Sequence, residues 1–439
     1  MRRHGLLIFV VAILLAFAGI GLLSPVAPAQ ADTLTAAGDL RWYRGNMHTH
    51  SHWSDGDDYL ESIAAWYQKA GYQFLVFTDH NVLADSQKWV EIKKTKGQEP
   101  AFEKLKQQFP EWVEERTVDG RHEVRLRRFE EVAQRFNKAE EFLLIQGEEI
   151  SDHHHKHPLH LNVSNIKELI TPRGGDSVVE VIQNNVDAAI AQRERTGQPM
   201  IIHLNHPNFG YAVTAEDIMR IIGERFFEIY NGHPGVNNTG DTLHAGCEPI
   251  WDIVLTKRLA ELHLPVMFGI AVDDSHLYHN IPSRAPEPGR GWVMVLAKEL
   301  TAGSLIEALE AGRFYSSSGV RLSRVDSSAA GLSIEVDAVP GEEYVIEFIG
   351  TRRGYDPQGQ PVLDDDGTKV HTTRRYSPDI GAVLATVKGA KARYEMQSDD
   401  IYVRARVTSS AAHPNPSEVG ESQRAWVQPV IGPAGRVKR

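Results

Sequence analysis

Eight short apolar runs constrain the fold of this 439-residue chain more than any other feature of its sequence. Longer segments with helical periodicity, such as residues 59–70 and 177–195, separate several of these runs. Strand-like runs that alternate with helix-like segments are typical of an α/β unit with a mostly parallel sheet. We therefore expect such a unit over residues 40–319, with strands at residues 42–47, 74–77, 142–145, 159–163, 200–204, 226–230, 266–272 and 292–296.

Two further regions have a different character. Residues 86–141, between the second and third runs, are rich in Lys, Glu, Gln and Arg, and we expect surface helices there that cover one side of the functional site. After about residue 319, short alternating segments are separated by Gly, Pro and Asp turns. This period-two pattern predicts that residues 320–439 form a small β-sandwich-like domain.

The N-terminus has the anatomy of a secretory signal. Arg2 and Arg3 precede an apolar run over residues 6–23, and the small-residue site Ala29-Gln30-Ala31 follows it. Residues 1–31 are therefore expected to be a signal peptide cleaved after Ala31, so that the protein is exported to the periplasm or the extracellular space. The alternative is an uncleaved membrane anchor, because a run of about 18 residues just reaches spanning length.

The composition excludes some classes of function. The formal net charge is −11, and no nucleic-acid partner is expected because such proteins carry a basic face. Cys247 is the single cysteine, so the chain has neither an intramolecular disulfide nor a thiolate metal site. Any metal ion must be held by nitrogen and oxygen atoms.

Residues of metal-ligand type follow five of the apolar runs. The carboxyl ends of strands in parallel α/β folds gather functional groups at one edge, so these residues point to one site. Histidines supply neutral nitrogen ligands, and carboxylates offset the charge of several divalent ions and can bridge two of them. The candidates are His48, His50 and Asp55 after the first run, His80 after the second, Glu148 or Glu149 after the third, His206 after the fifth, and Asp274 and His276 after the seventh.

In this order the motifs resemble those of the polymerase and histidinol phosphatase (PHP) superfamily. The resemblance covers about residues 45–319, and it implies a distorted (β/α)7 barrel with a trinuclear metal site. The residues that carry it are His48-Thr49-His50 with Ser54-Asp55-Gly56, Thr78-Asp79-His80, Gly147-Glu148-Glu149, His160, His206-Pro207 and Asp274-Ser275-His276.

The same resemblance implies the ligands and the reaction. Two or three divalent ions of zinc, manganese or iron would be held by nitrogen and oxygen ligands. The implied reaction is hydrolysis of a phosphate monoester or diester of a small phosphorylated substrate, by a hydroxide that bridges two ions. By resemblance His48, His50, Glu149 and Asp274 hold one ion, Asp55, His80 and His276 a second, and Glu149, His160 and His206 a third.

Several neighbours compete with these assignments. Glu149 is preferred to Glu148 because it has the family's spacing, and His206 is preferred to His203, which is expected to point to the other face of its strand. Three alternatives are open for the stretch His153-His154-His155 with His157. It forms a solvated loop, it lines the rim of the site, or it is a loop that binds metal ions. His52 and His279 are expected near the mouth without being ligands, and Asp79 and Asp273 are expected to orient ligands.

Two arginines follow the last ligand closely. The planar guanidinium groups of Arg284 and Arg290 are candidates for binding a phosphate, and the alternative is that both are ordinary surface residues.

An alternative function from another class is a non-enzymatic exported module that binds metal or glycan, with the β-rich C-terminal region as the binding element.

Overall fold

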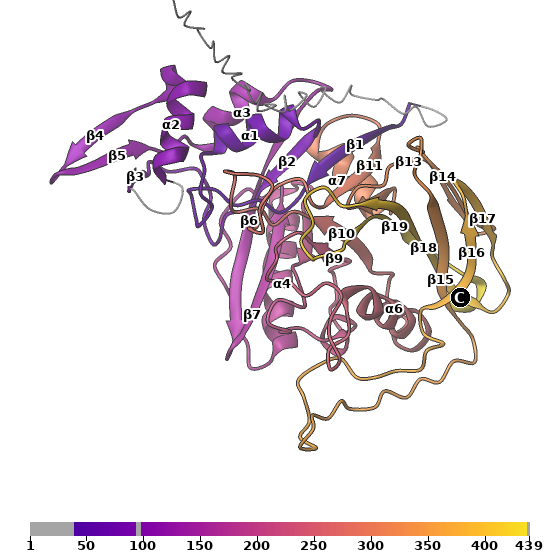
Figure 1. Ribbon diagram of the computed structural model, residues 1–439. Helices are drawn as coiled ribbons and strands as arrows, with labels where there is room; N and C mark the ends of the chain where they lie inside the picture. The colour runs from indigo at the N-terminus through magenta and orange to yellow at the C-terminus, as the bar shows by residue number, and fades with distance from the viewer. Residues whose placement is uncertain (1–38, 94–97, 437–439) are drawn as a thin grey trace, which may run out of the picture.

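A 13-stranded mixed sheet forms the frame of the computed structural model, which describes residues 39–93 and 98–436 (Figure 1). The expected signal peptide lies outside these residues. All eight predicted strands are confirmed. The strands of the sheet are β1 (Arg41–Asn46), β2 (Phe74–Phe77), β6 (Leu143–His154), β7 (His157–Ser164), β8 (Ile201–Leu204), β9 (Phe226–Asn231), β10 (Phe268–Val272), β11 (Trp292–Ala297), β12 (Phe314–Ser317), β15 (Tyr344–Arg352), β16 (Ala382–Lys388), β18 (Asp400–Ala412) and β19 (Ser422–Ile431).

The expected distorted (β/α)7 barrel is not confirmed, because the sheet of the described residues does not close into a barrel. The strand order is β10-β9-β8-β7-β6-β2-β1-β11-β12-β19-β18-β15-β16, so β1 pairs with β2 on one side and with β11 on the other. Because both edges of β1 are taken, β10 meets it only through an isolated parallel bridge between Thr49 and Ser275, beyond the strand ends. The sheet is also mixed, since β7 runs antiparallel to both β6 and β8.

Helices pack against the sheet as the sequence predicts. The described helices of this region include α1 (Leu60–Lys69), α4 (Val178–Thr196), α5 (Ala215–Ile218), α6 (Cys247–Lys257) and α7 (Ala302–Glu310), and the π-helical turn η2 (Arg258–Leu262) continues α6. Ser177 caps α4 by accepting a hydrogen bond from the Glu180 amide, and Gly197 ends it with a left-handed φ of 67°. None of the helices in the described residues has the length and apolar character needed to cross a membrane.

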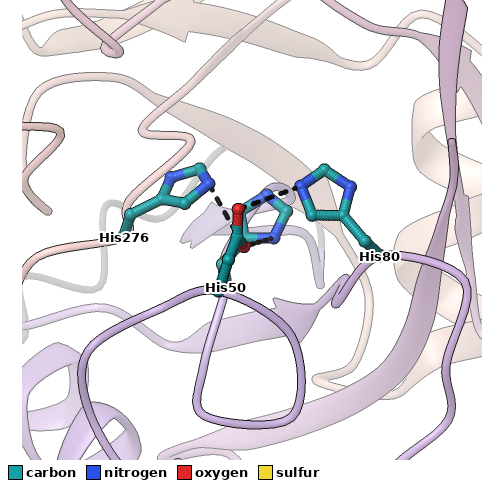
Figure 2. A group of neighbouring side chains, drawn as sticks. His50, His80 and His276 are labelled. Atoms are coloured by element: carbon teal, nitrogen blue, oxygen red, sulfur yellow. Dashed lines mark ion pairs between the residues drawn. The ribbon is translucent and has the colours of Figure 1, made fainter. Parts of the chain in front are cut away.

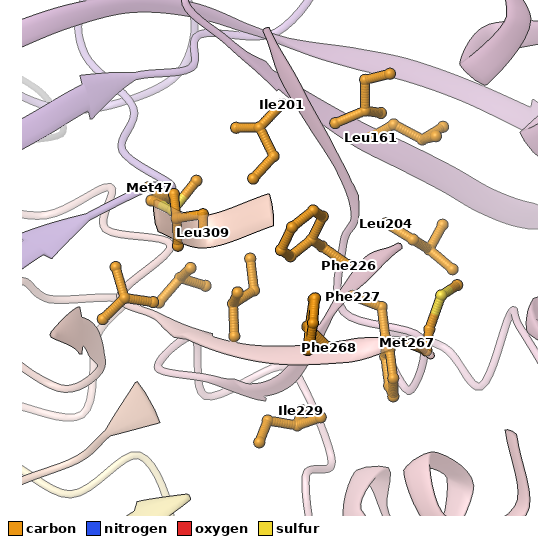
Figure 3. Packing of buried hydrophobic residues seen from close by; sticks show 14 of the residues in the cluster. Met47, Leu161, Ile201, Leu204, Phe226, Phe227, Ile229, Met267, Phe268 and Leu309 are labelled. Atoms are coloured by element: carbon orange, nitrogen blue, oxygen red, sulfur yellow. The ribbon is translucent and has the colours of Figure 1, made fainter. Parts of the chain in front are cut away.

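The main core lies between these helices and the strands that carry the predicted ligands. Phe226, Phe227 and Ile229 of β9 pack with Phe268 of β10, and all four side chains are buried (Figure 3). Burial of large apolar side chains stabilises a folded chain by about 1.5–3 kcal/mol each. The strand ends are thereby held in fixed positions.

The insertion contains strands as well as the expected helices. Its elements are β3 (Trp89–Glu91), α2 (Gln98–Gln108), the short 3-10 helix η1 (Pro110–Trp112), β4 (Glu115–Val118), β5 (Arg121–Arg125) and α3 (Phe129–Phe136). The prediction of helices alone was wrong, because the three strands form an antiparallel sheet in the order β3-β5-β4. The β4–β5 hairpin projects from one side of the molecule (Figure 1). Its turn uses positive φ values at Asp119 and Gly120, and Asp-Gly is a hairpin signal that could have revealed it.

The C-terminal strands continue the main sheet. Tyr315 of β12 pairs with Val427 of β19, so the sheet crosses residue 319 without interruption. A second antiparallel sheet of β13 (Leu322–Ser328), β14 (Gly331–Val336) and β17 (Lys391–Glu395) adds a further layer, and Ile334 and Phe348 share one buried cluster. The long connection between β15 and β16 returns to α5, where the Tyr376 hydroxyl donates to Glu216 at 2.8 Å (Figure 1).

Candidate metal centre

The structure brings all nine predicted metal ligands together. The strand ends explain the convergence, because β1, β2, β8 and β10 end at the edge of the sheet where β6 and β7 pass. The ligand candidates are His48, His50 and Asp55 after β1, His80 after β2, Glu149 in β6, His160 in β7, His206 after β8, and Asp274 and His276 after β10.

Glu149 lies at the centre of this cluster. It is fully buried, and burial alone would raise its pKa. The imidazoles of His80, His48 and His160 overcome that effect and hold the pKa of Glu149 well below its ordinary value. Its carboxylate oxygens lie 2.7 Å from His80 Nδ1, 3.0 Å from His160 Nδ1, 3.3 Å from His50 Nε2, 3.4 Å from His48 Nε2 and 3.5 Å from His206 Nε2.

Asp274 joins the buried side of the cluster. Its Oδ1 lies 3.2 Å from both His48 Nε2 and His50 Nε2. Burial would raise the pKa of Asp274, but His48, His50 and His276 hold it well below the ordinary value. The backbone of Asp274 has a φ of 51°, a left-handed conformation that is uncommon in non-glycine residues but several-fold enriched in Asp.

Asp55 forms the outer part of the cluster. Figure 2 shows the rings of His50, His80 and His276 converging, and Asp55 carboxylate oxygens lie 3.5 Å from a ring nitrogen of each. The Asp55 side chain is 55% exposed, whereas that of His50 is fully buried. Burial together with His276 and His80 lowers the pKa of His50 to about 3, so this imidazole is neutral and suited to a metal. The cluster therefore has a closed floor and an open side at Asp55.

Several buried ligand atoms lack a hydrogen-bond partner. Within the described residues, His48 Nε2, His50 Nε2 and Glu149 Oε2 have no partner in hydrogen-bonding geometry. A buried polar atom without a partner destabilises the fold by about 1–3 kcal/mol. Divalent ions would satisfy these atoms, and a set of imidazole and carboxylate donors suits zinc, manganese or iron.

The geometric groups differ in part from the division that the resemblance implies. His50 joins Asp55, His80 and His276 in one group, in addition to its place beside His48 and Glu149. His206 groups with His48 and Asp274, while His160 groups with His80 and Glu149. The implied third set of Glu149, His160 and His206 is thus spread over two neighbouring groups.

Glu228 supports the cluster from below and was not found from the sequence. Its Oε1 lies 2.7 Å from His48 Nδ1, and its Oε2 accepts the His206 amide at 2.7 Å. A carboxylate on the far nitrogen of an imidazole fixes the ring's orientation toward a metal. The signal was present, because a glutamate inside the buried strand β9 is costly unless it has partners.

The two predicted orienting aspartates lie beside the ligands. Asp79 accepts hydrogen bonds from the amide and hydroxyl of Ser51 and from those of Ser54, and so holds the loop that leads to Asp55. Asp273 accepts from the Tyr67 hydroxyl and from the amides of three residues that follow β10 in the chain, namely Gly289, Arg290 and Gly291.

The structure separates the competing neighbours. Glu148 points away from the cluster, its Oε2 accepts the Ile170 amide at 2.9 Å, and burial raises its pKa to about 7. His203 is buried beneath the cluster, with Nε2 3.3 Å from Glu228 Oε1, and so the expectation that it faces away was wrong. The chain leaves strand geometry after Leu204, so His203 contacts Glu228 with its ring while His206 contacts Glu228 with its backbone amide and Glu149 with its ring.

The histidine-rich stretch forms the tip of the β6–β7 hairpin. His153 and His155 are exposed there, and the His157 ring lies 4.3 Å from that of His371, in the connection between β15 and β16. His52 and His279 border the cluster through backbone contacts, with His52 Nδ1 donating to Gly56 O at 3.0 Å and His279 Nε2 donating to Asp57 O at 3.2 Å.

The two arginines differ from each other. Arg284 is exposed in the loop after His276, where contact with a substrate stays a prediction. Arg290 is fully buried, and its guanidinium donates to Gly232 O at 2.8 Å and to Asn415 O at 3.1 Å. The structure therefore contradicts a phosphate-gripping role for Arg290, because internal acceptors already occupy its donors.

Comparison with solved structures finds remote likenesses. No family model and no curated protein matches the chain. A two-domain protein of Bacteroides vulgatus ATCC 8482, containing a predicted PHP-like metal-dependent phosphoesterase, is 13% identical with a TM-score of 0.39, over 89% of this chain and 96% of that one. A candidate metal-dependent phosphoesterase of Bifidobacterium adolescentis ATCC 15703 is 13% identical with a TM-score of 0.26, over 53% of this chain and 87% of that one.

Proposed function

We propose that this protein hydrolyses phosphate esters with two or three divalent ions held by the histidine and carboxylate cluster. The observation that carries the proposal is the position of Glu149, whose carboxylate lies within 3.5 Å of imidazole nitrogens from five histidines. A buried carboxylate in that position is suited to bridge two ions. The order of the motifs along the chain supports phosphate esters as the substrate class.

The charge balance of the centre favours an anionic substrate once three ions are bound. Asp55, Glu149 and Asp274 contribute three negative charges and the supporting Glu228 a fourth, so two divalent ions would leave the centre neutral. A third ion would raise its charge to +2. A positive site with partly buried walls attracts an anion such as a phosphoryl group. When bound, the ions supply a water of lowered pKa and stabilise the phosphoryl oxygens.

The residues of the chain divide the remaining work. His48, His50, Glu149 and Asp274 form the buried floor and would hold the ions, supported by Glu228. Asp55, His80 and His276 have partly exposed side chains at 55%, 28% and 17%, so the substrate would enter on their side. Asp55, His80 and His276 would therefore line the side on which an ester and the attacking water reach the ions.

The proposed site of action is outside the cytoplasm. The residue pattern of the first 31 positions supports export. Sequencing the N-terminus of the mature protein should give Asp32 as its first residue, and an intact Met1 start in the membrane fraction would support an anchor instead.

A paired substitution in β6 tests the function. We expect the metal-loaded chain to cleave members of a panel of phosphate monoesters and diesters, and metal removal to abolish cleavage. Glu149→Gln should lose at least one ion and reduce turnover by about 100-fold or more, because a bridging carboxylate is lost. Glu148→Gln is the matched control and should keep the wild-type metal count and turnover. A metal-loaded wild type that cleaves no ester would favour the non-enzymatic binding module.

A further inference from the structure

The segment that follows β9 is fixed directly to the metal cluster. Asn231 Nδ2 donates to Asp274 Oδ2 at 3.0 Å and to Glu228 Oε2 at 2.8 Å. Asn231 Oδ1 accepts the backbone amide of His233 at 2.8 Å. One buried side chain therefore sets the position of His233 relative to a predicted ligand.

Arg290 holds the same segment from its other side. Its Nη1 donates to the Gly232 carbonyl at 2.8 Å, and Asn415 of the C-terminal region fixes the guanidinium through Oδ1 at 3.1 Å. A Cβ atom at Gly232 would lie 2.7 Å from Arg290 Cβ and 2.8 Å from Asp273 O. The backbone is therefore closely packed at this point, and the His233 ring is carried on a rigid support.

The protonation of the His233 ring is set by its own turn. The backbone amide of Gly235 donates to His233 Nδ1 at 2.9 Å, so Nδ1 is an acceptor and the neutral ring carries its proton on Nε2. Within the part of the chain that the structure describes, Nε2 has no hydrogen-bond partner. The ring is partly exposed and lies edge-on to His276, with ring centroids 5.5 Å apart.

We propose that His233 forms an oxyanion subsite, in which the Nε2–H group donates a hydrogen bond to an oxygen of a phosphoryl group bound on the metal cluster. This inference rests on the proposed function. A nitrogen that carries a proton cannot ligate a metal, and His233 belongs to none of the groups of described residues that could hold an ion. A fixed donor beside His276 suits a tetrahedral anion with several acceptor oxygens.

Binding of inorganic phosphate to the metal-loaded full chain tests this subsite, with calorimetry as the measurement. His233→Ala should weaken phosphate binding by about 10- to 100-fold, since a hydrogen bond to a charged group is lost, and should leave the metal count unchanged. His233→Gln should recover part of the affinity, because its amide places a donor near the position of Nε2. His122→Ala, an exposed histidine on β5, is the control and should bind phosphate like the wild type.

Different results would overturn different claims. Phosphate affinity unchanged in His233→Ala, in a chain that still cleaves esters, would overturn the subsite alone. A lower metal count in His233→Ala would make His233 a ligand and would also overturn the subsite. A metal-loaded wild type that neither binds phosphate nor cleaves an ester would overturn the proposed function together with the subsite.

Discussion

Two buried clusters of charged residues show opposite ways of solving the same problem. Between α6 and β18, Arg404 donates to both carboxylate oxygens of Asp252 at 2.7 and 2.6 Å, and the Tyr402 hydroxyl adds a bond of 2.8 Å. In the candidate metal centre, Glu149 is surrounded by histidines, yet its Oε2, which lies 2.7 Å from His80 Nδ1, has no partner in hydrogen-bonding geometry among the described residues. The first cluster is complete in itself, whereas the second needs a ligand.

The difference has a physical basis in the geometry of the donors. The guanidinium of Arg404 matches a carboxylate in two parallel hydrogen bonds, and although burial opposes it, Asp252 raises the pKa of Arg404 above its ordinary value. The imidazoles of the metal centre instead direct ring nitrogens toward a shared space between carboxylates. The ion pair of Arg404 and Asp252 therefore holds α6 against β18. The converging imidazoles and carboxylates instead form a site that could hold ions.

The largest expected effect comes from the two neighbouring histidines after β8. His206→Ala should lower the metal count and reduce turnover by about 100-fold or more, because a ligand is lost. His203→Ala should reduce turnover by about 10-fold or less, since His203 contacts Glu228 beneath the cluster and is not one of the nine predicted ligands. Elemental analysis and turnover should be measured on both variants. Equal losses would show that the division between ligand and support is wrong.

The cluster of Asp252 and Arg404 should respond in the opposite way, with a loss of stability and no loss of metal. Asp252→Asn should lower the free energy of unfolding by about 3 kcal/mol, because Arg404 is left without its charged partner in a buried position. The metal count of the folded protein should not change. Urea unfolding gives the first quantity and elemental analysis the second. Loss of ions from folded Asp252→Asn protein would show that the two clusters are coupled.

A third buried charge, Glu61 of α1, has neither an ion pair nor a place in the metal centre among the described residues. Burial, with a further contribution from Asp58, raises its pKa to about 7 from the ordinary 4.5. The folded state therefore binds this proton more tightly than the unfolded state, and the free energy of unfolding should fall as pH rises from about 4.5 to 7.

Glu61→Gln should reduce that pH dependence and stabilise the protein by about 1–3 kcal/mol above pH 7, relative to the wild type. Thermal unfolding between pH 4 and 8 measures the effect. Glu194→Gln, an exposed position on α4, is the control and should follow the wild-type curve. A slope that stays the same in Glu61→Gln would show that Glu61 is not the group responsible.

The sequence predicted the strands and the convergence of the ligands because both depend on local patterns. An apolar run followed by His48 or Asp274 carries its information within a few residues. Closure of the barrel could not be predicted in this way, because it depends on β1 pairing with β11, about 250 residues away. The strands of the insertion were missed because β4 is exposed along its whole length and lacks an alternating pattern.

The supporting residues were missed for a related reason. Nothing near Arg290 in the sequence indicates that Gly232 and Asn415 will enclose it, so closeness to the last ligand suggested a substrate contact. His233 lies three residues after the predicted strand 226–230, but it belongs to none of the motifs that carry the resemblance, and its role depends on the Gly235 amide and on Asn231. Such roles follow from contacts that only the folded chain makes.

A metal count on the purified full chain tests the central claim most directly. After loading with zinc, manganese or iron and removal of loosely bound ions, elemental analysis should find two or three ions per wild-type chain. The same count should remain in Asp252→Asn, and at least one ion should be missing from Glu149→Gln. A folded wild-type chain that retains none of these ions would contradict the assignment of the histidine and carboxylate cluster around Glu149 as a metal centre.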